Sequence, residues 1–263
     1  MDEKTNGKIY GVIALKGGVG KTTVVENLGA TFAKDFQKKV LIVDANFSTP
    51  HLGLHIGIID PTHTLHSVLN EEYPVYQAIY HHELGFHVIP GKLSSPPTNI
   101  NILKQKIEPL RRIYDIILID SSPSLDKEIL AAMIASDELL VVSSPDYPTL
   151  SSTIHAVNVA KREDTPIRGI ILNKVRSKRF EISSRDISKA SEVKVLAKIP
   201  ENVKVLSALS QMIPIVVRYP SHEVSKSYKE LASLLLDIPA KKSRISRLKD
   251  KFQSKKKEVE NYD

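Results

Sequence analysis

Short runs of apolar, β-branched residues recur along the chain, and stretches with helical periodicity separate most of them. The apolar positions within each run are continuous rather than alternating, which is typical of strands that are buried on both faces of a sheet. The pattern predicts seven strands, at residues 9–15, 40–44, 86–89, 116–120, 139–143, 169–173 and 193–199.

Helical periodicity predicts six helices, at residues 22–35, 100–113, 127–135, 149–161, 182–190 and 223–236. Strands that alternate with helices are typical of a parallel sheet, because each return to the same edge needs a crossover connection. We therefore expect an α/β fold in which a mostly parallel sheet carries helices on both faces.

The composition of the chain changes at Pro239. The segment from Ala240 to the end holds nine Lys and Arg residues against four Asp and Glu, so it carries +5 of the total charge of +7. The preceding residues are nearly neutral. We therefore expect a folded domain at residues 1–239 and a basic amphipathic or flexible C-terminal tail at residues 240–263.

The loop after the first predicted strand carries the strongest chemical signal. It reads Lys-Gly-Gly-Val-Gly-Lys-Thr-Thr from Lys16 to Thr23 and leads directly into a predicted helix. Glycines let successive backbone N–H groups turn toward an anion, and the start of the helix adds a positive dipole end. Gly20, Lys21 and Thr22 match the end of a Walker A loop, in which the lysine contacts the β- and γ-phosphates and the hydroxyl binds Mg²⁺.

The usual Walker A loop begins with glycine, whereas this one begins with Lys16. The complete loop resembles the deviant Walker A loop of the MinD/ParA family of ATPases. The resemblance implies the fold of P-loop NTPases, binding of ATP or ADP with Mg²⁺, and ATP hydrolysis. It also implies an ATP-dependent homodimer, in which Lys16 of each protomer reaches the phosphates of the nucleotide in the other.

Later segments are similar to further family motifs in the same order. Asp120, at the end of the strand 116–120, resembles the Walker B acid that holds Mg²⁺ through water. Asn173 and Lys174 resemble the base-recognition element, and Pro200 and Glu201 lie in a segment similar to a loop that packs over the base. The resemblance assigns Mg²⁺ binding to Thr22, Asp44 and Asp120, and nucleotide binding to Lys16, Gly17, Gly18, Val19, Gly20, Lys21, Thr22, Thr23, Asn173, Lys174, Pro200 and Glu201.

One position departs from the family pattern. MinD-like proteins usually end the second strand in Asp-x-Asp, and the second acid helps to position the attacking water, whereas this chain has Asp44 followed by Asn46. An amide can hydrogen-bond a water but carries no negative charge. We therefore expect catalysis by Lys16, Lys21, Asp44 and Asn46 to be slow rather than absent, although a neutral variation at Asn46 fits the sequence equally well.

The basic tail fits three hypotheses. Ile245, Leu248 and Phe252 form one helical stripe among the basic residues between Lys241 and Lys257, a pattern typical of weak, reversible contact with an anionic membrane. MinD proteins are similar in ending with such a helix. The second hypothesis, which is disfavoured, is non-specific contact with nucleic acid, and the third is a solvated or partner-binding end.

Composition excludes several other classes. The chain has no cysteine, so thiolate metal sites, iron–sulfur clusters and a cysteine nucleophile are excluded. Its apolar runs are too short to cross a bilayer, and its start does not resemble a signal peptide, so we expect a cytoplasmic protein with peripheral contact at the inner face of the membrane. Four histidines, His51, His55, His63 and His66, lie close in sequence without a carboxylate or cysteine framework, which favours surface histidines over a metal site.

These patterns favour a dimerising switch ATPase that positions components in cell division or chromosome partitioning, with an unidentified activating partner protein. Two further functions stay open. One is a scaffold that binds nucleotide with little turnover, which the uncharged Asn46 would fit. The second is a small-molecule ligase on the same fold.

Overall fold

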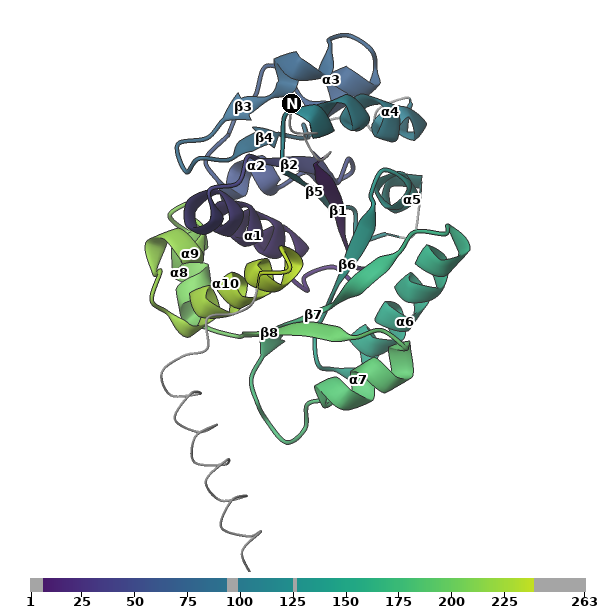
Figure 1. The fold of residues 1–263 in the computed structure, drawn as a ribbon, viewed down its shortest axis with the longest axis vertical. Helices are drawn as coiled ribbons and strands as arrows, with labels where there is room; N and C mark the ends of the chain where they lie inside the picture. Colours follow the sequence, from purple (N-terminus) through teal and green to yellow (C-terminus); the bar gives the residue numbers. More distant parts are fainter. Residues whose placement is uncertain (1–6, 94–98, 125–126, 239–263) are drawn as a thin grey trace, which may run out of the picture. The chain divides into compact units, whose positions relative to one another are not determined.

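An eight-stranded sheet forms the framework of residues 7–93, 99–124 and 127–238, the ranges that the computed structural model describes (Figure 1). The strand order is β3-β4-β2-β5-β1-β6-β7-β8. Neighbouring strands are parallel except for β3 and β4, which run antiparallel at one edge. The strands are β1 (Lys8–Ile13), β2 (Val40–Ala45), β3 (Tyr80–His81), β4 (His87–Ile89), β5 (Ile116–Ser121), β6 (Glu138–Ser143), β7 (Ile167–Val175) and β8 (Val195–Pro200).

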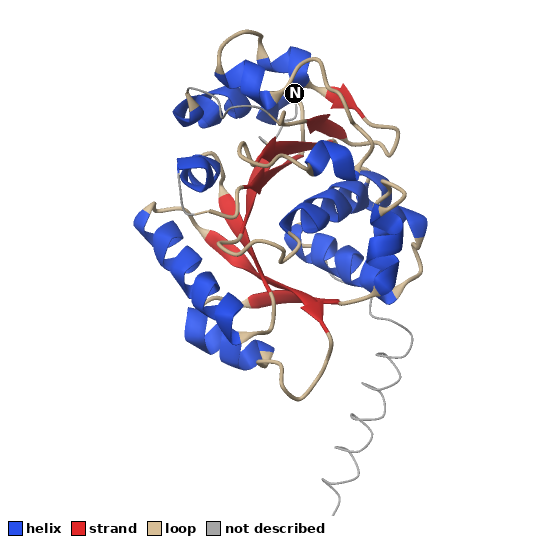
Figure 2. Cartoon of the chain, turned by 180° about the vertical axis from the view of Figure 1, so that it is seen from behind, coloured by secondary structure: helices blue, strands red, loops and turns tan. Residues whose placement is uncertain are grey.

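Helices cover both faces of this sheet, as Figure 2 shows. Helix α1 packs on one face, and α5, α6 and α7 lie on the other (Figure 1). The α-helices are α1 (Lys21–Phe36), α2 (Leu52–His55), α3 (Leu65–Leu69), α4 (Leu103–Ile107), α5 (Lys127–Ile134), α6 (Tyr147–Arg162), α7 (Ser184–Ser191), α8 (Val203–Leu209), α9 (Ile215–Arg218) and α10 (Glu223–Leu235). The expected α/β architecture is confirmed.

The seven predicted strands are present with shifted ends, and the two-residue strand β3 is an addition. Every position of the central strands β2 and β5 is buried, which explains why their sequences are continuously apolar as far as Asp44 and Asp120. Most of the missed elements, such as α2, α8 and α9, are too short for periodicity to reveal.

The continuous helix predicted at residues 100–113 is wrong. That stretch consists of a 3₁₀ turn (Ile100–Ile102), the short helix α4 and a second 3₁₀ turn (Glu108–Arg112). Pro109 lies at the start of the second turn and has no N–H to donate to an earlier carbonyl. The α-helical hydrogen-bond ladder therefore ends at Ile107.

The chain divides into two units, residues 1–232 and residues 233–263. In the second unit the described residues 233–238 form the end of α10 and a turn, in which the Ser233 hydroxyl donates to the Ile238 carbonyl at 2.9 Å. The predicted boundary at Pro239 and the basic stripe between Lys241 and Lys257 lie outside the described residues. None of the helices in the described ranges is long and apolar enough to cross a membrane.

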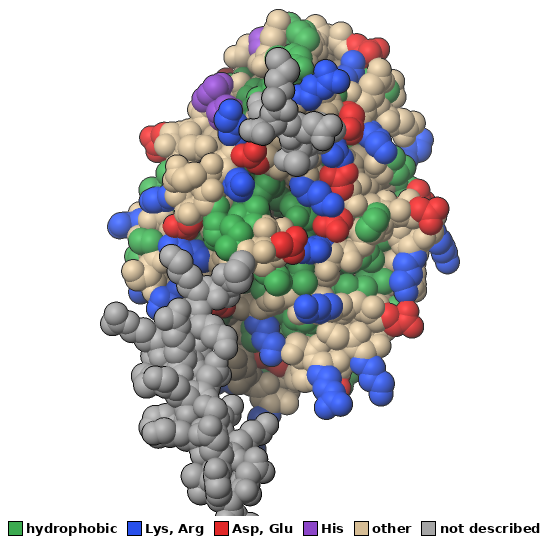
Figure 3. All heavy atoms as spheres, viewed as in Figure 1, with side chains coloured by type: hydrophobic (Ala, Val, Ile, Leu, Met, Phe, Trp, Pro, Cys, Tyr) green, Lys and Arg blue, Asp and Glu red, His purple; other side chains and the backbone are tan. Residues whose placement is uncertain are grey.

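The face of the molecule in Figure 3 mixes charges of both signs. In Figure 3, Lys and Arg side chains alternate with Asp and Glu side chains over the face in view. This distribution agrees with the near-neutral net charge of the residues that precede the tail.

The loop that follows β2 is held by a buried carboxylate on α5. Glu128 is 5% exposed, and its Oε2 accepts hydrogen bonds from the backbone N–H groups of Phe47, at 3.0 Å, and Ser48, at 3.3 Å. Its Oε1 accepts the Ser48 hydroxyl at 2.5 Å. One side chain therefore fixes the start of a loop that lies, as described below, beside the candidate site.

We expect Glu128→Ala to lower the free energy of unfolding by about 3 kcal/mol, because it leaves two backbone N–H groups without their acceptor in a buried position. Denaturant titration measures this change. Glu230→Ala, which removes an exposed glutamate from α10, serves as the control and should change stability by less than about 0.5 kcal/mol. Equal effects of the two substitutions would contradict the anchoring role of Glu128.

Candidate phosphate-binding site

The Lys16–Thr23 loop connects β1 to α1 at the carboxyl edge of the parallel strands. Gly18 and Gly20 have φ values of +76° and +92°, a region that side-chain-bearing residues rarely adopt. Gly20 is also the N-cap of α1, and no side chain caps that helix start. The first N–H groups of α1 are therefore left for an anion, as the glycine pattern predicts.

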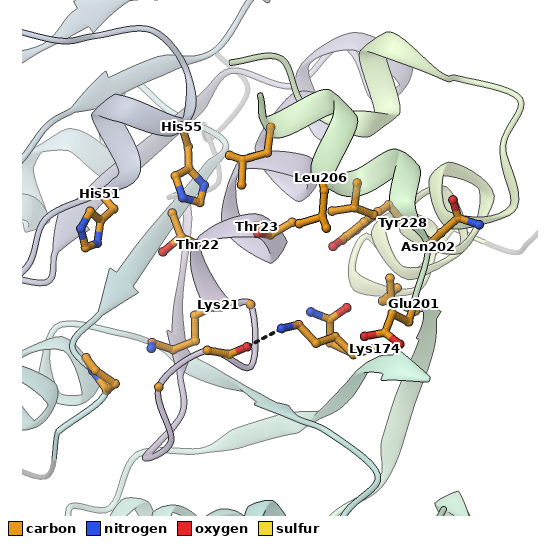
Figure 4. A pocket seen from close by; sticks show the side chains of 18 of the residues that line it. Lys21, Thr22, Thr23, His51, His55, Lys174, Glu201, Asn202, Leu206 and Tyr228 are labelled. Atoms are coloured by element: carbon orange, nitrogen blue, oxygen red, sulfur yellow. Dashed lines mark hydrogen bonds between the residues drawn. The ribbon is translucent and has the colours of Figure 1, made fainter. Parts of the chain in front are cut away.

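Two residues from the end of β7 hold this loop. The Asn173 side-chain amide donates to the Val19 carbonyl at 2.8 Å, and the Lys174 ammonium donates to the Gly18 carbonyl at 2.7 Å (Figure 4). A Cβ atom at Gly20 would lie 2.4 Å from the Asn173 amide nitrogen, so the close approach of Asn173 also requires glycine there. The structure places Asn173 and Lys174 against the phosphate loop, and a role in reading the base stays a prediction.

Two buried carboxylates end the adjacent strands β2 and β5, where Asp44 and Asp120 are register partners. Asp120 Oδ2 accepts the Thr22 hydroxyl at 2.6 Å. Asp44 instead accepts the backbone N–H groups of Asn46, at 3.2 Å, and Leu52, at 3.0 Å, so it closes the loop between them. The structure thus brings Thr22 and Asp120 into direct contact and places Asp44 beside them.

The second oxygen of Asp120, Oδ1, is buried and has no hydrogen-bond partner among the described residues. A buried carboxylate oxygen without a donor is costly, and a hydrated cation would satisfy it. Thr22 and Asp120 together offer the hard oxygen ligands that Mg²⁺ prefers. The residues present therefore fit the magnesium site that the sequence predicts.

The pKa values of three ionisable groups at this point of the site are shifted by burial and by one another. Burial raises the pKa of Asp120, and the nearby Lys21 ammonium opposes only part of that shift. Burial, followed by repulsion from Asp120, raises the pKa of Asp44 well above its ordinary value. Burial also lowers the pKa of Lys21, against the attraction of Asp120. Without a ligand, ionisation of all three groups is therefore disfavoured. A bound cation would favour the charged forms of Asp44 and Asp120, and a bound anion would favour the charged form of Lys21.

Lys16 points away from these groups. Its ammonium contacts the Asp146 carboxylate at 3.2 Å and the Thr149 hydroxyl at 2.7 Å, at the start of α6. Burial would raise the pKa of Asp146, but hydrogen bonds from Ser144, Thr149 and Lys16 lower it to about 2. The ion pair between Lys16 and Asp146 is about 40% exposed on each side, so it contributes little to stability.

Asn46 is engaged within its own loop. Its amide nitrogen donates to the Thr49 carbonyl at 2.6 Å, and its amide oxygen accepts from the Thr49 backbone N–H and hydroxyl at 3.4 and 3.2 Å. Both ends of the amide are therefore occupied by Thr49, although the residue still lies at the wall of the cavity described next.

A cavity of about 810 Å³ opens in front of the phosphate loop (Figure 4). Most of the predicted site residues line it, namely Gly17, Gly18, Gly20, Lys21, Thr22, Thr23, Asn46, Asn173, Lys174, Pro200 and Glu201. Lys16, Val19, Asp44 and Asp120 are not part of the lining. The cavity thus gathers residues from the ends of β1, β7 and β8 that are far apart in the sequence.

The sequence analysis did not assign several residues that line this cavity. His51 and His55 line it near Thr22, and Tyr228 and Leu206 line it near Asn202 (Figure 4). Leu206 lies on the short helix α8 and is 65% exposed, an arrangement that suits an apolar ring face. These residues are distant in sequence from the glycine loop, so no local pattern connected them with it. The described residues contain no group of three or more His, Cys, Asp or Glu side chains that could hold a metal ion. The expectation of surface histidines is wrong for His66, which is 4% exposed because its ring packs against Phe47 and contacts the Phe47 carbonyl at 3.2 Å.

Comparison with known proteins shows that the chain is similar to nucleotide-binding proteins. A protein-family profile described as an AAA domain matches residues 7–168. An ATP-binding protein of Methanocaldococcus jannaschii is 31% identical over 227 residues, which cover 85% of this chain and 86% of that protein.

Two solved structures are similar in fold and length. The cell division ATPase MinD of Pyrococcus furiosus superposes with a TM-score of 0.83 at 31% identity, over 88% of this chain and 99% of that one. The septum site-determining protein MinD of Pyrococcus horikoshii, solved in complex with Mg-ADP, also has a TM-score of 0.83, at 28% identity over 90% of this chain and 99% of that one.

We expect Asp120→Asn to raise or preserve the melting temperature of the ligand-free protein at pH 7. The raised pKa means that the folded chain retains a proton that the unfolded chain releases near pH 3.8, so stability falls as pH rises from that value through the raised pKa. The asparagine variant loses this part of the pH slope, and it also loses the extra stabilisation that Mg²⁺ adds to bound nucleotide.

Melting curves between pH 4 and pH 8, with and without Mg²⁺ and nucleotide, measure both effects. Asp60→Asn, at an exposed position, is the control and should leave the curves unchanged. A clear drop in the melting temperature of Asp120→Asn at pH 7, with the parent's pH slope retained, would contradict this account.

Proposed function

The chain belongs to the MinD/ParA family of P-loop ATPases, and on that premise we propose that it is a nucleotide-dependent switch that positions other cell components. In this proposal it binds ATP with Mg²⁺, dimerises in the ATP-bound form and is reset by slow hydrolysis. One observation carries the proposal: the glycine loop, Lys21 and Thr22 face a cavity of nucleotide size, and the Asp120 oxygen that lacks a partner among the described residues lies beside them.

The residues at the cavity have separate tasks in this proposal. The backbone of the glycine loop and the Lys21 ammonium hold the phosphates, and Thr22 with Asp120 holds the hydrated Mg²⁺, which neutralises charge on the transferred phosphoryl group. Binding of the phosphates supplies an anionic neighbour that favours the charged form of the buried Lys21. Asp44 keeps the loop between Asn46 and Leu52 closed beside these groups.

Lys16 supports the dimer part of the proposal. A lysine that completes the site of a second protomer must be accessible and must be able to leave its contacts in the single chain. The Lys16 side chain is 41% exposed, and its pairing with Asp146 is weak because water screens it. Transfer of the Lys16 ammonium from Asp146 to the phosphates of a partner's nucleotide therefore costs little free energy.

Asn46 supports slow turnover. Its amide is held by Thr49, and it adds no negative charge to the cavity wall. The same observation favours one alternative, a scaffold that binds ATP and barely hydrolyses it. The two differ in whether turnover is measurable, whereas nucleotide binding and dimerisation are common to both.

We also propose peripheral contact with an anionic membrane through the tail between Lys241 and Lys257, inside the cytoplasm, with non-specific DNA as the less favoured surface. This proposal rests on the residue pattern of the tail and its charge of +5. Two tails in a dimer would bind such a surface far more tightly than one, so ATP would control the attachment.

We expect a non-hydrolysable ATP analogue with Mg²⁺ to double the molar mass of the protein, while ADP leaves it unchanged. Light scattering after size-exclusion chromatography measures this mass. Lys16→Ala should abolish the doubling and preserve binding of the analogue, because the Lys16 ammonium is bonded to Asp146 and Thr149, which lie outside the lining of the nucleotide cavity.

A mass that ignores both the nucleotide and Lys16 would contradict the switch. Lys38→Ala serves as the matched control, since it removes a lysine elsewhere on the chain. It should dimerise as the parent does.

We expect Asn46→Asp to raise the rate of single-turnover ATP hydrolysis about tenfold with little change in nucleotide affinity. Aspartate cannot donate to the Thr49 carbonyl, so one carboxylate oxygen is released toward the cavity and adds the charge that positions a water. Rapid quench with radiolabelled ATP measures the rate. A rate equal to or below that of the parent would show that Asn46 is a neutral variation.

A further inference from the structure

A buried carboxylate and a histidine form a pair at the wall of the nucleotide cavity. Glu26 lies on α1, four residues after Thr22, and is 3% exposed. Its Oε2 contacts Nδ1 of His55, at the end of α2, at 3.1 Å. His55 lines the cavity and points toward Thr22 (Figure 4).

The pair is a built feature rather than an accident of packing. The other oxygen of Glu26, Oε1, accepts the Asn27 amide at 3.3 Å, so both carboxylate oxygens have partners. Glu26 lies between apolar positions of α1 that are also buried, Val25 and Leu28, beside the buried Asn27. A buried ion pair is usually no more stabilising than apolar side chains of the same volume, so stability alone does not explain its presence.

The pairing fixes which edge of the His55 ring faces the cavity. Nδ1 is occupied by Glu26, whereas Nε2 has no hydrogen-bond partner among the residues that the structure describes. When the pair shares one proton, Nε2 carries a hydrogen in both possible arrangements. If the proton lies on His55, both ring nitrogens are protonated. If it lies on Glu26, the neutral ring adopts the Nε2–H tautomer. The pair therefore presents a donor to the cavity.

The surroundings of that donor are those of a phosphate site. The cavity wall near His55 contains Lys21 and Thr22, which the proposed function assigns to the phosphates and Mg²⁺. Asp120 lies close enough to His55 to influence its charge. An N–H aimed at this end of the cavity meets phosphate oxygens rather than a base or a ribose.

We propose that the Glu26–His55 pair is an additional phosphate-binding element of the nucleotide site, in which His55 donates its Nε2–H to a phosphate oxygen and Glu26 positions the ring. The inference rests on the proposed binding of ATP and adds a contact that the glycine loop does not supply. His55 is the binding residue, and Glu26 acts through it.

Several groups face the pair and set its protonation. Lys21 lies near it on α1, His51 at the start of α2, Asp120 on β5 and Tyr228 on α10. Burial by itself lowers the pKa of His55, but Glu26 and Asp120 outweigh it and raise the pKa, and burial also raises the pKa of Glu26. Both shifts favour retention of the shared proton, and its loss would turn Nε2 into an acceptor that repels phosphate.

The decisive test is the double variant Glu26→Leu with His55→Leu, which fills the same volume with apolar side chains. Its ligand-free melting temperature should equal or exceed that of the parent, because no buried charge is left unpaired. Its dissociation constants for Mg-ADP and for a non-hydrolysable Mg-ATP analogue, measured by titration calorimetry, should be roughly ten- to a hundredfold weaker. His155→Gln, at an exposed position on α6, is the control and should bind as the parent does.

A double variant that is folded and binds both nucleotides as tightly as the parent would overturn the inference and leave the proposed function intact. A parent that binds neither nucleotide would instead overturn the proposed function. The two failures are thus distinguishable in one set of titrations.

Glu26→Gln tests the positioning role separately, because glutamine keeps an acceptor for Nδ1–H and removes the charge. The pH at which nucleotide affinity declines should move to lower values in this variant, since His55 loses the anion that holds its proton. In the parent, ¹⁵N NMR of the His55 ring should show a shift of Nε2 on addition of Mg-ADP. An unchanged pH profile together with an unperturbed Nε2 signal would overturn the positioning role and the contact.

Discussion

Two carboxylates that lie side by side without solvent set the conditions for the whole site. Asp44 and Asp120 end adjacent parallel strands in register, and both are almost completely buried. Placing two anions there is costly unless cations accompany them, and the nearby ammonium of Lys21 is itself disfavoured by burial. By itself the site is therefore electrostatically unsatisfied, and a phosphate chain with its metal ion completes it.

The fold absorbs part of this cost through backbone donors. Asp44 is stabilised in part by the N–H groups that it accepts from the following loop, and Glu128 accepts two more from the same loop. The segment after β2 is thus tied to carboxylates on two different elements. These polar contacts hold the segment close to the cavity.

The sequence predicted what depends on local pattern. The continuous apolar runs located the sheet, and the glycine spacing located the loop whose φ values at Gly18 and Gly20 need glycine. It could not predict the contacts between distant residues: the Lys16–Asp146 pair spans 130 positions, and the attachment of Asn173 to the loop spans 154. The helix predicted around Pro109 failed for a local reason, because periodicity took no account of the missing N–H.

The attachment of Lys174 and Asn173 to the glycine loop has a consequence for selectivity. Because a peptide unit is planar and trans, a carbonyl held at Gly18 or Val19 fixes the N–H of the next residue on the opposite side of the peptide. The loop is thus already shaped for phosphate before any ligand arrives, and binding does not have to order it. A loop that is preset in this way offers the same backbone contacts to a diphosphate and to a triphosphate. Discrimination between the two must therefore come from groups that can exchange partners, such as the Lys16 side chain, which is 41% exposed and weakly paired with Asp146.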